Sequence, residues 1–214
     1  MHHKITDLRT EYLKSSLDVN TVHADPFNQF EKWFNEALKA EVIEPNAMHL
    51  STVNEVGKPS SRIVLLKGID QKKFIFYTNY QSKKGKELEI NPACAITFFW
   101  PDLERQVRIE GVASRVDQQI SETYFQSRPR ASQIGAWSSP QSSPIQNRSI
   151  LEERFKEIEK RFENQPILPK PHQWGGFGVE PFLFEFWQGR ASRLHDRIEY
   201  ILVDGKWKIS RLAP

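Results

Sequence analysis

The chain has 214 residues, of which 38% are hydrophobic and 12% aromatic, so it holds enough apolar material to bury a core. Thirty Lys and Arg residues against 27 Asp and Glu residues leave a formal charge of +3, which argues against nucleic acid as the main partner. No run approaches the roughly 20 apolar residues of a membrane-spanning helix, and the charged N-terminus lacks a signal-peptide pattern. The single cysteine, Cys94, excludes an internal disulfide, and we expect a buried thiol in a cytoplasmic protein.

The first half of the chain predicts one amphipathic helix followed by strands. A polar segment around Asp7 to Leu17 is expected to be a helix or a flap. Asp25 and Pro26 are typical of an N-cap and a first helical residue, and apolar residues at a spacing of three and four continue this helix, which ends near Pro45. The next three strands are expected over 48–53, 61–69 and 74–78. Their short connections favour antiparallel pairing.

In the second half of the chain, the expected helices and strands do not alternate regularly. Further helices are expected over 82–90, from Asp117 to about Ser127, and over 147–162. Further strands are expected over 93–100, 105–115, 177–187, 192–203 and 207–212. Asp204-Gly205 is typical of a hairpin turn. We therefore expect a mainly β, antiparallel fold with flanking helices, since a parallel sheet would need strands that alternate with helices.

Two groups of cations are candidate anion sites. Arg62 and Lys67 flank an apolar strand segment, and their odd separation places them on opposite faces, which suits two different anions. Lys83 and Lys84 lie at the start of a short helix, where backbone N–H groups and the helix dipole favour phosphate. The alternative for both groups is that the cations are solvated at the ends of their elements.

Two further patterns point to a ligand. Tyr124, Arg128 and Ser132 are spaced by four; Pro129 ends the helix, so Ser132 is expected from the following loop, and the three side chains suit a phosphate monoester. The alternative is a partly buried tyrosine beside a surface arginine. Arg193, His195 and Arg197 are expected on one face of a strand, where three potential cations need an anion or a stacked ring system in front of them.

These segments resemble the pyridoxamine 5′-phosphate oxidases, FMN-dependent enzymes of the split-barrel class. The motifs that carry the resemblance lie at 8–12, 62–67, 77–78, 132–137, 174–177, 193–197 and 207–214, so it covers nearly the whole chain. It implies an FMN-binding split β-barrel, with residues 1–20 as an N-terminal flap segment and residues 21–214 as the FMN-binding domain with C-terminal dimerisation strands.

The resemblance also implies roles for individual residues. Arg193 and His195 are expected to be catalytic and to lie against the pyridine ring of the substrate. The cofactor-binding residues are expected to be Arg62, Ile63, Val64, Leu65, Leu66, Lys67, Tyr77, Thr78, Lys83, Lys84, Gln106, Gln141, Ser142, Trp187 and Arg197. The substrate-binding residues are expected to be Arg9, Thr10, Glu11, Tyr12, Lys67, Tyr124, Arg128, Ser132, Arg193, Leu194 and His195. No metal is expected.

The implied activity is the oxidation of pyridoxamine 5′-phosphate and pyridoxine 5′-phosphate to pyridoxal 5′-phosphate, with reduction of dioxygen to hydrogen peroxide. The implied assembly is a homodimer with FMN at the subunit interface, with no nucleic acid or membrane partner. Two positions depart from the family: Lys83 stands where relatives often have arginine, and Asp18-Val19-Asn20 stands where some are arginine-rich.

Three other functions stay open from the sequence. A flavin reductase or deazaflavin-dependent reductase shares the fold class, but Arg193, His195 and the Tyr124, Arg128, Ser132 group are not expected together there. A non-catalytic flavin or pyridoxal phosphate carrier would keep the same binding residues. A nucleic-acid-binding barrel would use its aromatic side chains as stacking platforms, but the nearly balanced charge disfavours it.

Overall fold

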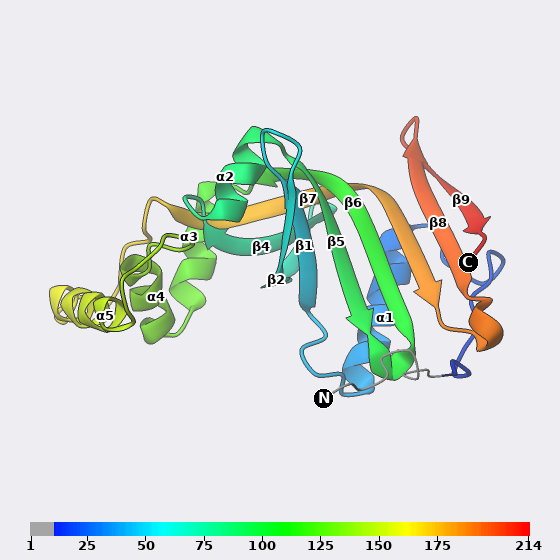
Figure 1. Cartoon of the computed structure of the whole chain (residues 1–214), viewed down its shortest axis with the longest axis horizontal. Coiled ribbons are helices and arrows are strands. Elements are labelled where there is room, and N and C mark those ends of the chain that lie inside the picture. Colours follow the sequence, from blue (N-terminus) through cyan, green and yellow to red (C-terminus); the bar gives the residue numbers. More distant parts are fainter. Residues whose placement is uncertain (1–10) are drawn as a thin grey trace. The chain divides into compact units, whose positions relative to one another are not determined.

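The computed structural model describes residues 11–214, and Figure 1 labels their main elements. The helices are α1 (Pro26–Lys39), α2 (Lys83–Ile90), α3 (Gln118–Ser127), α4 (Arg130–Ser138) and α5 (Ser149–Arg161), with short 3-10 turns η2 (Pro101–Leu103) and η3 (Ala191–Arg193). The strands are β1 (Ala47–Val53), β2 (Pro59–Leu65), β3 (Gly68–Asp70), β4 (Lys73–Asn79), β5 (Ala93–Trp100), β6 (Arg105–Arg115), β7 (Trp174–Gln188), β8 (Asp196–Val203) and β9 (Lys206–Leu212). Within this described part, no helix is long and apolar enough to cross a membrane.

The strands form one sheet in the order β2-β1-β5-β6-β7-β4-β3, while β8 pairs with β7 and β9 with β8. The β3–β4, β4–β7, β7–β8 and β8–β9 pairs are antiparallel. β7 is the longest strand: its first residues pair with β4, where Trp174 lies opposite Asn79, and its last residues pair with β8, where Trp187 lies opposite Arg197. The expected mainly β, antiparallel architecture with flanking helices is confirmed.

The chain divides into two compact units, each described here by itself. Unit 1 contains the described residues up to His49 together with Ala95–Glu110 and Pro181–Pro214. Unit 2 contains Leu50–Cys94 and Gly111–Glu180. The candidate site residues therefore fall into two sets, one in each unit.

The core of unit 1 forms around α1. This helix begins as expected, because the Asp25 carboxylate accepts a hydrogen bond from the Phe27 N–H at 2.8 Å and Pro26 occupies the first turn. Phe30 packs on Phe98 of β5 at 5.0 Å between ring centroids, and Trp33 meets Phe186 of β7 edge-on at 5.3 Å. The helix is therefore anchored to the sheet by aromatic contacts.

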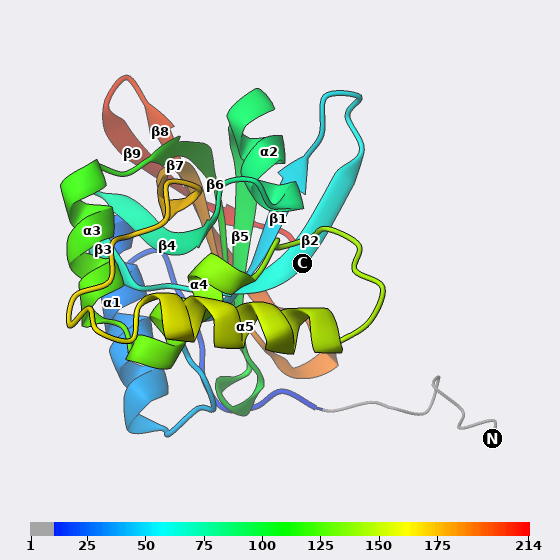
Figure 2. The ribbon, with the colours of Figure 1, turned by 90° about the vertical axis from the view of Figure 1, so that its left-hand side faces the viewer.

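The core of unit 2 joins α3, α4 and α5, and Figure 2 shows α4 and α5 side by side. Its buried hydrophobic residues are Phe125, Ile134, Phe162, Leu168 and Trp174. Cys94 of β5 is also buried, as expected, and burial raises the pKa of its thiol to about 12. This thiol therefore stays protonated at neutral pH.

The expected loop around Ser132 is wrong, because Ser132 lies in α4. Pro129 ends α3, but its carbonyl oxygen then accepts hydrogen bonds from the N–H groups of Ser132 and Gln133, at 2.8 and 3.1 Å. A second helix therefore starts directly after the proline. Proline is tolerated at such a position, since its missing N–H costs nothing at a helix start.

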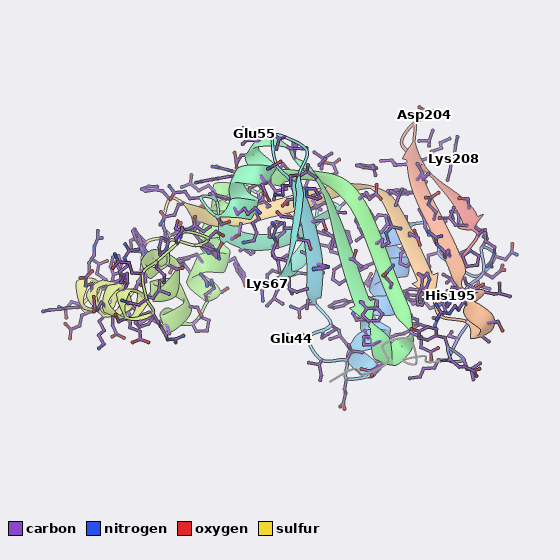
Figure 3. All side chains as sticks on the ribbon, in the orientation of Figure 1. Glu44, Glu55, Lys67, His195, Asp204 and Lys208 are labelled. Carbon is purple, nitrogen blue, oxygen red and sulfur yellow. The ribbon has the colours of Figure 1, made fainter. Side chains whose placement is uncertain are left out.

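The single strand expected over 61–69 is also wrong, because β2 ends at Leu65 and β3 begins at Gly68. Leu66 turns into the core, and the Lys67 N–H donates to the Ile75 carbonyl oxygen at 2.8 Å. The chain changes its pairing partner from β1 to β4 at this point. Lys67 therefore lies in a connection, at the position labelled in Figure 3.

The ends of two other strands differ from expectation. β8 begins at Asp196 and not at Ser192, because Ser192 and Arg193 adopt left-handed backbone conformations with φ of 56° and 61°. Arg193, His195 and Arg197 therefore do not lie on one strand face. β7 begins at Trp174, earlier than expected. The helix considered for 7–17 is absent from its described part, residues 11–17, and residues 7–10 lie outside the description.

Candidate active site

Unit 2 contains a cavity of about 510 Å³. Its lining residues come from β2, β4, β7, α2, α3, α4 and the adjoining connections: Ile63, Val64, Leu65, Lys67, Tyr77, Thr78, Lys84, Tyr124, Arg128, Pro129, Ser132, Gln141 and Trp174. All of them except Pro129 and Trp174 were expected from the sequence to bind the cofactor or the substrate. The structure thus brings members of both sets into one cavity.

One part of the cavity is polar and contains an ammonium group. The Lys84 Nζ donates to the Thr78 Oγ1 and to the Gln141 Oε1, both at 3.2 Å, and the Thr78 hydroxyl donates to the same Gln141 oxygen at 3.0 Å. Burial, and then the charge of Arg62, lower the pKa of Lys84. α2 starts beside it, capped by the Ser82 hydroxyl. A phosphate is the kind of anion that this end of a helix accommodates.

Other expected cofactor residues lie outside the cavity lining. Arg62 pairs with the buried Glu87 carboxylate at 3.3 Å and donates to the Leu50 carbonyl oxygen at 3.2 Å. The exposed Lys83 lies 3.9 Å from the same carboxylate. Burial acts to raise the pKa of Glu87, but hydrogen bonds from Thr52 and Ser60, together with Arg62, lower it. No sequence pattern distinguishes Glu87 from the other charged residues of this helix.

Leu66 and Ser142 are also absent from the cavity lining. Leu66 is buried in the core where the chain passes from β2 to β3. Ser142 follows the cavity residue Gln141 and has a left-handed φ of 69°.

The second part of the cavity is formed around Arg128. α3 ends at Ser127 and Arg128 is extended, so it does not share the last helical turn with Tyr124 as expected. Its Nη1 is buried and has no hydrogen-bond partner, and no carboxylate of the described residues lies within ion-pair distance of it. Burial lowers the pKa of Arg128. A buried donor of this kind is costly unless a ligand supplies the acceptor.

An aromatic wall completes the cavity. Tyr77 stacks on Tyr124 at 3.9 Å and 15°, and on Trp174 at 5.3 Å and 8°. Burial, with the neighbouring Tyr124, raises the pKa of Tyr77 to about 12, so its hydroxyl stays neutral. Trp174 was not among the expected site residues, although the Trp174-Gly175-Gly176 motif belongs to the segments that carry the family resemblance. A Cβ on Gly176 would approach the Tyr77 ring within 3.0 Å, so this glycine leaves room for the wall.

The expected catalytic histidine lies in unit 1, at the position labelled in Figure 3. The His195 ring lies 4.6 Å from the Trp187 ring and 5.7 Å from the Tyr12 ring. Its Nδ1 accepts a hydrogen bond from the Arg190 backbone N–H at 3.2 Å, which leaves the proton of the neutral imidazole on Nε2. Burial and the charge of Arg193 lower the pKa of His195. The imidazole is therefore neutral, with an N–H to donate.

Arg197 finds an anion inside unit 1. Its Nε and Nη2 donate to the two oxygens of Glu185 at 2.8 and 3.0 Å, and its Nη1 donates to the Ala213 carbonyl oxygen at 2.8 Å. Arg108 of β6 also pairs with Glu185, at 2.8 Å. Residues 193, 195 and 197 were expected to need an anion or a stacked ring system in front of them, and for Arg197 the chain's own Glu185 is this anion. Glu185 was missed because it stands alone in the apolar run of β7.

The remaining expected residues are placed as follows. Gln106 is half-buried on β6, Leu194 is exposed after η3, and Glu11 is exposed at the start of the description. Arg9 and Thr10 lie outside the described residues. In the described part, no group of three His, Cys, Asp or Glu side chains is arranged to hold a metal ion.

The N-terminal segment is fixed onto unit 1 by backbone hydrogen bonds. The Lys14 N–H donates to the Glu104 carboxylate at 3.0 Å, and the Leu17 N–H donates to the Asp196 carboxylate at 3.0 Å. Tyr12 is thereby held against Trp187 at 5.7 Å, edge to face. The segment contributes an aromatic side chain to the surroundings of His195.

The chain is similar to known proteins over nearly its whole length. Residues 34–162 match the family model described as pyridoxamine 5′-phosphate oxidase, and residues 174–214 match the pyridoxine 5′-phosphate oxidase C-terminal dimerisation region. The chain is 52% identical to a pyridoxine/pyridoxamine 5′-phosphate oxidase of Burkholderia thailandensis, over 98% of this chain and 99% of the relative. It is also 52% identical to a protein of the same name from Acaryochloris marina, over 98% and 95% of the two chains.

Solved structures agree with this relationship. PhzG from Burkholderia lata, determined in complex with tetrahydrophenazine-1-carboxylic acid, is 28% identical and superposes with a TM-score of 0.86 over 94% of this chain and 100% of that one. An FMN-binding protein of Nostoc punctiforme, related to pyridoxamine 5′-phosphate oxidase, is 16% identical with a TM-score of 0.70 over 89% and 98%, and shows the fold alone. The expected split-barrel fold is confirmed. This chain therefore belongs to the pyridoxamine 5′-phosphate oxidase family of enzymes.

Proposed function

We propose that this enzyme uses FMN and dioxygen to oxidise pyridoxamine 5′-phosphate and pyridoxine 5′-phosphate to pyridoxal 5′-phosphate. The observation that carries the proposal is the Arg128 guanidinium, which lines the cavity with a buried Nη1 that has no partner. A phosphate of the ligand would supply the missing acceptor and the missing negative charge. The names of the relatives at 52% identity support this substrate class.

The substrate phosphate is assigned to one part of the cavity. Arg128, with Lys67, Tyr124 and Ser132, offers two cations and two hydroxyls to a dianion. The guanidinium supplies a planar pair of donors, whereas the ammonium acts as a point charge that adapts to the phosphate position. These residues would bind and orient the substrate and would favour phosphorylated over unphosphorylated vitamers.

The FMN phosphate is assigned to the other part. Lys84, Thr78 and Gln141 already form a hydrogen-bonded group there, and Arg62 and Lys83 add positive charge near the start of α2. The remaining cofactor contacts are assigned to the segment 63–67, to Tyr77 and to Ser142. FMN, when bound, would accept a hydride from the 4′-carbon of the substrate and pass the electrons to dioxygen, giving hydrogen peroxide.

The second set of residues is assigned to a homodimer. The match of residues 174–214 to a dimerisation region supports a homodimer, and we assign each FMN to contacts with both subunits. Gln106, Trp187 and Arg197 would complete the flavin site, while Arg193, Leu194 and His195 would lie against the pyridine ring of the substrate. The neutral His195 would present its Nε2–H to an acceptor on that ring. Glu11 and Tyr12, with Arg9 and Thr10, would cover the substrate.

An aerobic assay tests the proposal. The purified, FMN-supplemented protein is mixed separately with pyridoxine 5′-phosphate and with pyridoxamine 5′-phosphate, and pyridoxal 5′-phosphate is followed by absorbance. We expect turnover with both substrates and much weaker turnover with unphosphorylated pyridoxine. FMN binding without product from either substrate would contradict an oxidase and leave a carrier or a reductase. Oxidation of a reduced phenazine carboxylate instead would place the chain with PhzG, its relative at 28% identity.

A further inference from the structure

Arg128 combines a fixed backbone with a side chain that has few polar contacts. Its carbonyl oxygen accepts a hydrogen bond from Gln133 Nε2 at 3.0 Å, and its N–H donates to the Phe125 carbonyl oxygen at 3.2 Å. The guanidinium, by contrast, lies over the Trp174 ring with its Cζ 4.7 Å from the centroid, while Phe125 is farther away at 5.9 Å. The Nη1 has no polar partner that could orient the guanidinium. Of the two rings, Trp174 is the nearer, so its face orients this group.

Trp174 is itself held rigidly. Its side chain is 6% exposed and belongs to the core cluster of α3, α4 and α5. It stacks on Tyr77 at 8° and meets Phe125 edge-on at 5.3 Å. Its backbone lies opposite Asn79 in the β4–β7 pair, and its carbonyl oxygen accepts a hydrogen bond from Lys170 Nζ at 3.0 Å. A ring fixed by strand pairing and by stacking is a platform whose orientation does not depend on the ligand.

We propose that Trp174 is a positioning residue, whose indole face holds the Arg128 guanidinium so that the partnerless Nη1 is directed at the phosphate of the substrate. This inference rests on the proposed function, because the phosphate is the anion assigned to Arg128. A preorganised guanidinium spares the substrate the cost of ordering a long side chain on binding. Trp174 would therefore set the preference for phosphorylated substrates without touching the reacting carbon.

A double-mutant cycle on the FMN-loaded enzyme tests the proposal. The variants are Trp174→Leu, Trp174→Phe, Arg128→Ala and the Trp174→Leu/Arg128→Ala double variant, assayed with pyridoxine 5′-phosphate and with pyridoxine. We expect Trp174→Leu to raise KM for the phosphorylated substrate by about tenfold, with kcat and the KM for pyridoxine nearly unchanged. Trp174→Phe keeps a ring face and should recover part of the loss.

The cycle separates positioning from general damage. If Trp174 acts through Arg128, the Trp174→Leu change should have almost no further effect in the Arg128→Ala background. Additive losses, or equal losses with both substrates, would overturn the proposal. Should Trp174→Leu not fold, Trp174→Phe and its double variant with Arg128→Ala carry the same comparison.

A matched control is Trp137→Leu. Trp137 packs against the same core cluster and has its own arginine, Arg161, at 5.6 Å, but it does not line the cavity that contains Arg128. This variant should lower the melting temperature and leave KM unchanged.

The result can be told apart from a failure of the proposed function. If the wild type does not oxidise either vitamer, the function fails, and the positioning is measured by calorimetry with inorganic phosphate. Trp174→Leu should then weaken phosphate binding in the wild-type background but not in the Arg128→Ala background. An equal effect of Trp174→Leu on phosphate affinity in both backgrounds would overturn the inference.

Discussion

The types and spacing of individual side chains predicted residues of the candidate site, although the backbone conformation at two of them differs from expectation. Tyr124, Arg128 and Ser132 were selected by residue type and spacing, and all three line the cavity although two of them lie in other backbone conformations than expected. The chemistry of each side chain can be read from the sequence, whereas the backbone conformation after Pro129 depends on how α4 packs. Trp174 was missed because the strand was expected to begin only at Phe177, whereas β7 begins at Trp174 and places this ring beside Tyr77.

His195 gives a prediction about pH. Burial and the charge of Arg193 lower its pKa, so the imidazole takes up a proton only at a more acidic pH than an ordinary histidine. Replacing Arg193 by Gln removes one of these causes, and the pKa of His195 should rise toward its ordinary value. Titration of the ring proton by NMR in the FMN-loaded protein measures this. An unchanged or lower pKa would show that Arg193 does not act on the ring.

Gly189 gives a prediction about the N-terminal segment. A Cβ at this position would lie 2.7 Å from Tyr12 Cγ and 3.0 Å from Glu104 Cβ, so Gly189→Ala must push Tyr12 off Trp187. We expect Gly189→Ala to raise the KM for pyridoxine 5′-phosphate by about three- to tenfold, as for loss of one aromatic pair. Combining it with Tyr12→Ala should raise this KM little further. Gly68→Ala, which meets no atom within 4 Å, is the control for steady-state kinetics. Full additivity would argue against a shared cause.

At the scale of elements, the strongly patterned helices and strands were predicted well, and their junctions were not. α2, β5 and β6 have clear caps or apolar runs and lie where expected, whereas α1 begins where expected but ends at Lys39 and not near Pro45. The break between β2 and β3 exists because the two halves pair with different strands, which no local pattern reveals. The turn before β8 depends on Ser192 and Arg193 at positive φ, and neither residue type signals that conformation.

The pairing of β7 with β8 carries a prediction about the cofactor. Glu185 is 4% exposed and holds Arg197 through two charged hydrogen bonds, so it fixes a residue that we assign to FMN. Glu185→Gln keeps the shape but removes the charge, and the FMN dissociation constant should rise by about tenfold. Flavin fluorescence measures it.

The control for this change is Glu110→Gln. Glu110 pairs with Arg108 at 3.4 Å, and no contact between it and Arg197 is seen in the described structure. FMN binding should therefore stay unchanged in this variant. If both variants weaken FMN equally, the effect is one of overall charge and not of the position of Arg197.

At the scale of the whole molecule, turn signals and strand periods predicted the mainly β, antiparallel class, but not the sheet order. Strands β7 and β4 are neighbours although about a hundred residues separate them in the sequence, and such pairing depends on the complete set of long-range contacts. The family relationship supplies what local patterns do not. The flap at residues 1–20 and the dimer with shared FMN stay predictions.

The most direct measurement is an anaerobic titration of the FMN-loaded enzyme with pyridoxine 5′-phosphate, followed by admission of oxygen. We expect the flavin absorbance to bleach as pyridoxal 5′-phosphate forms in an amount equal to the bound FMN. On admission of oxygen, the flavin colour should return, and the total hydrogen peroxide should equal the total pyridoxal 5′-phosphate formed before and after that point. Product without flavin reduction, or a flavin that no phosphorylated vitamer reduces, would contradict the proposed function.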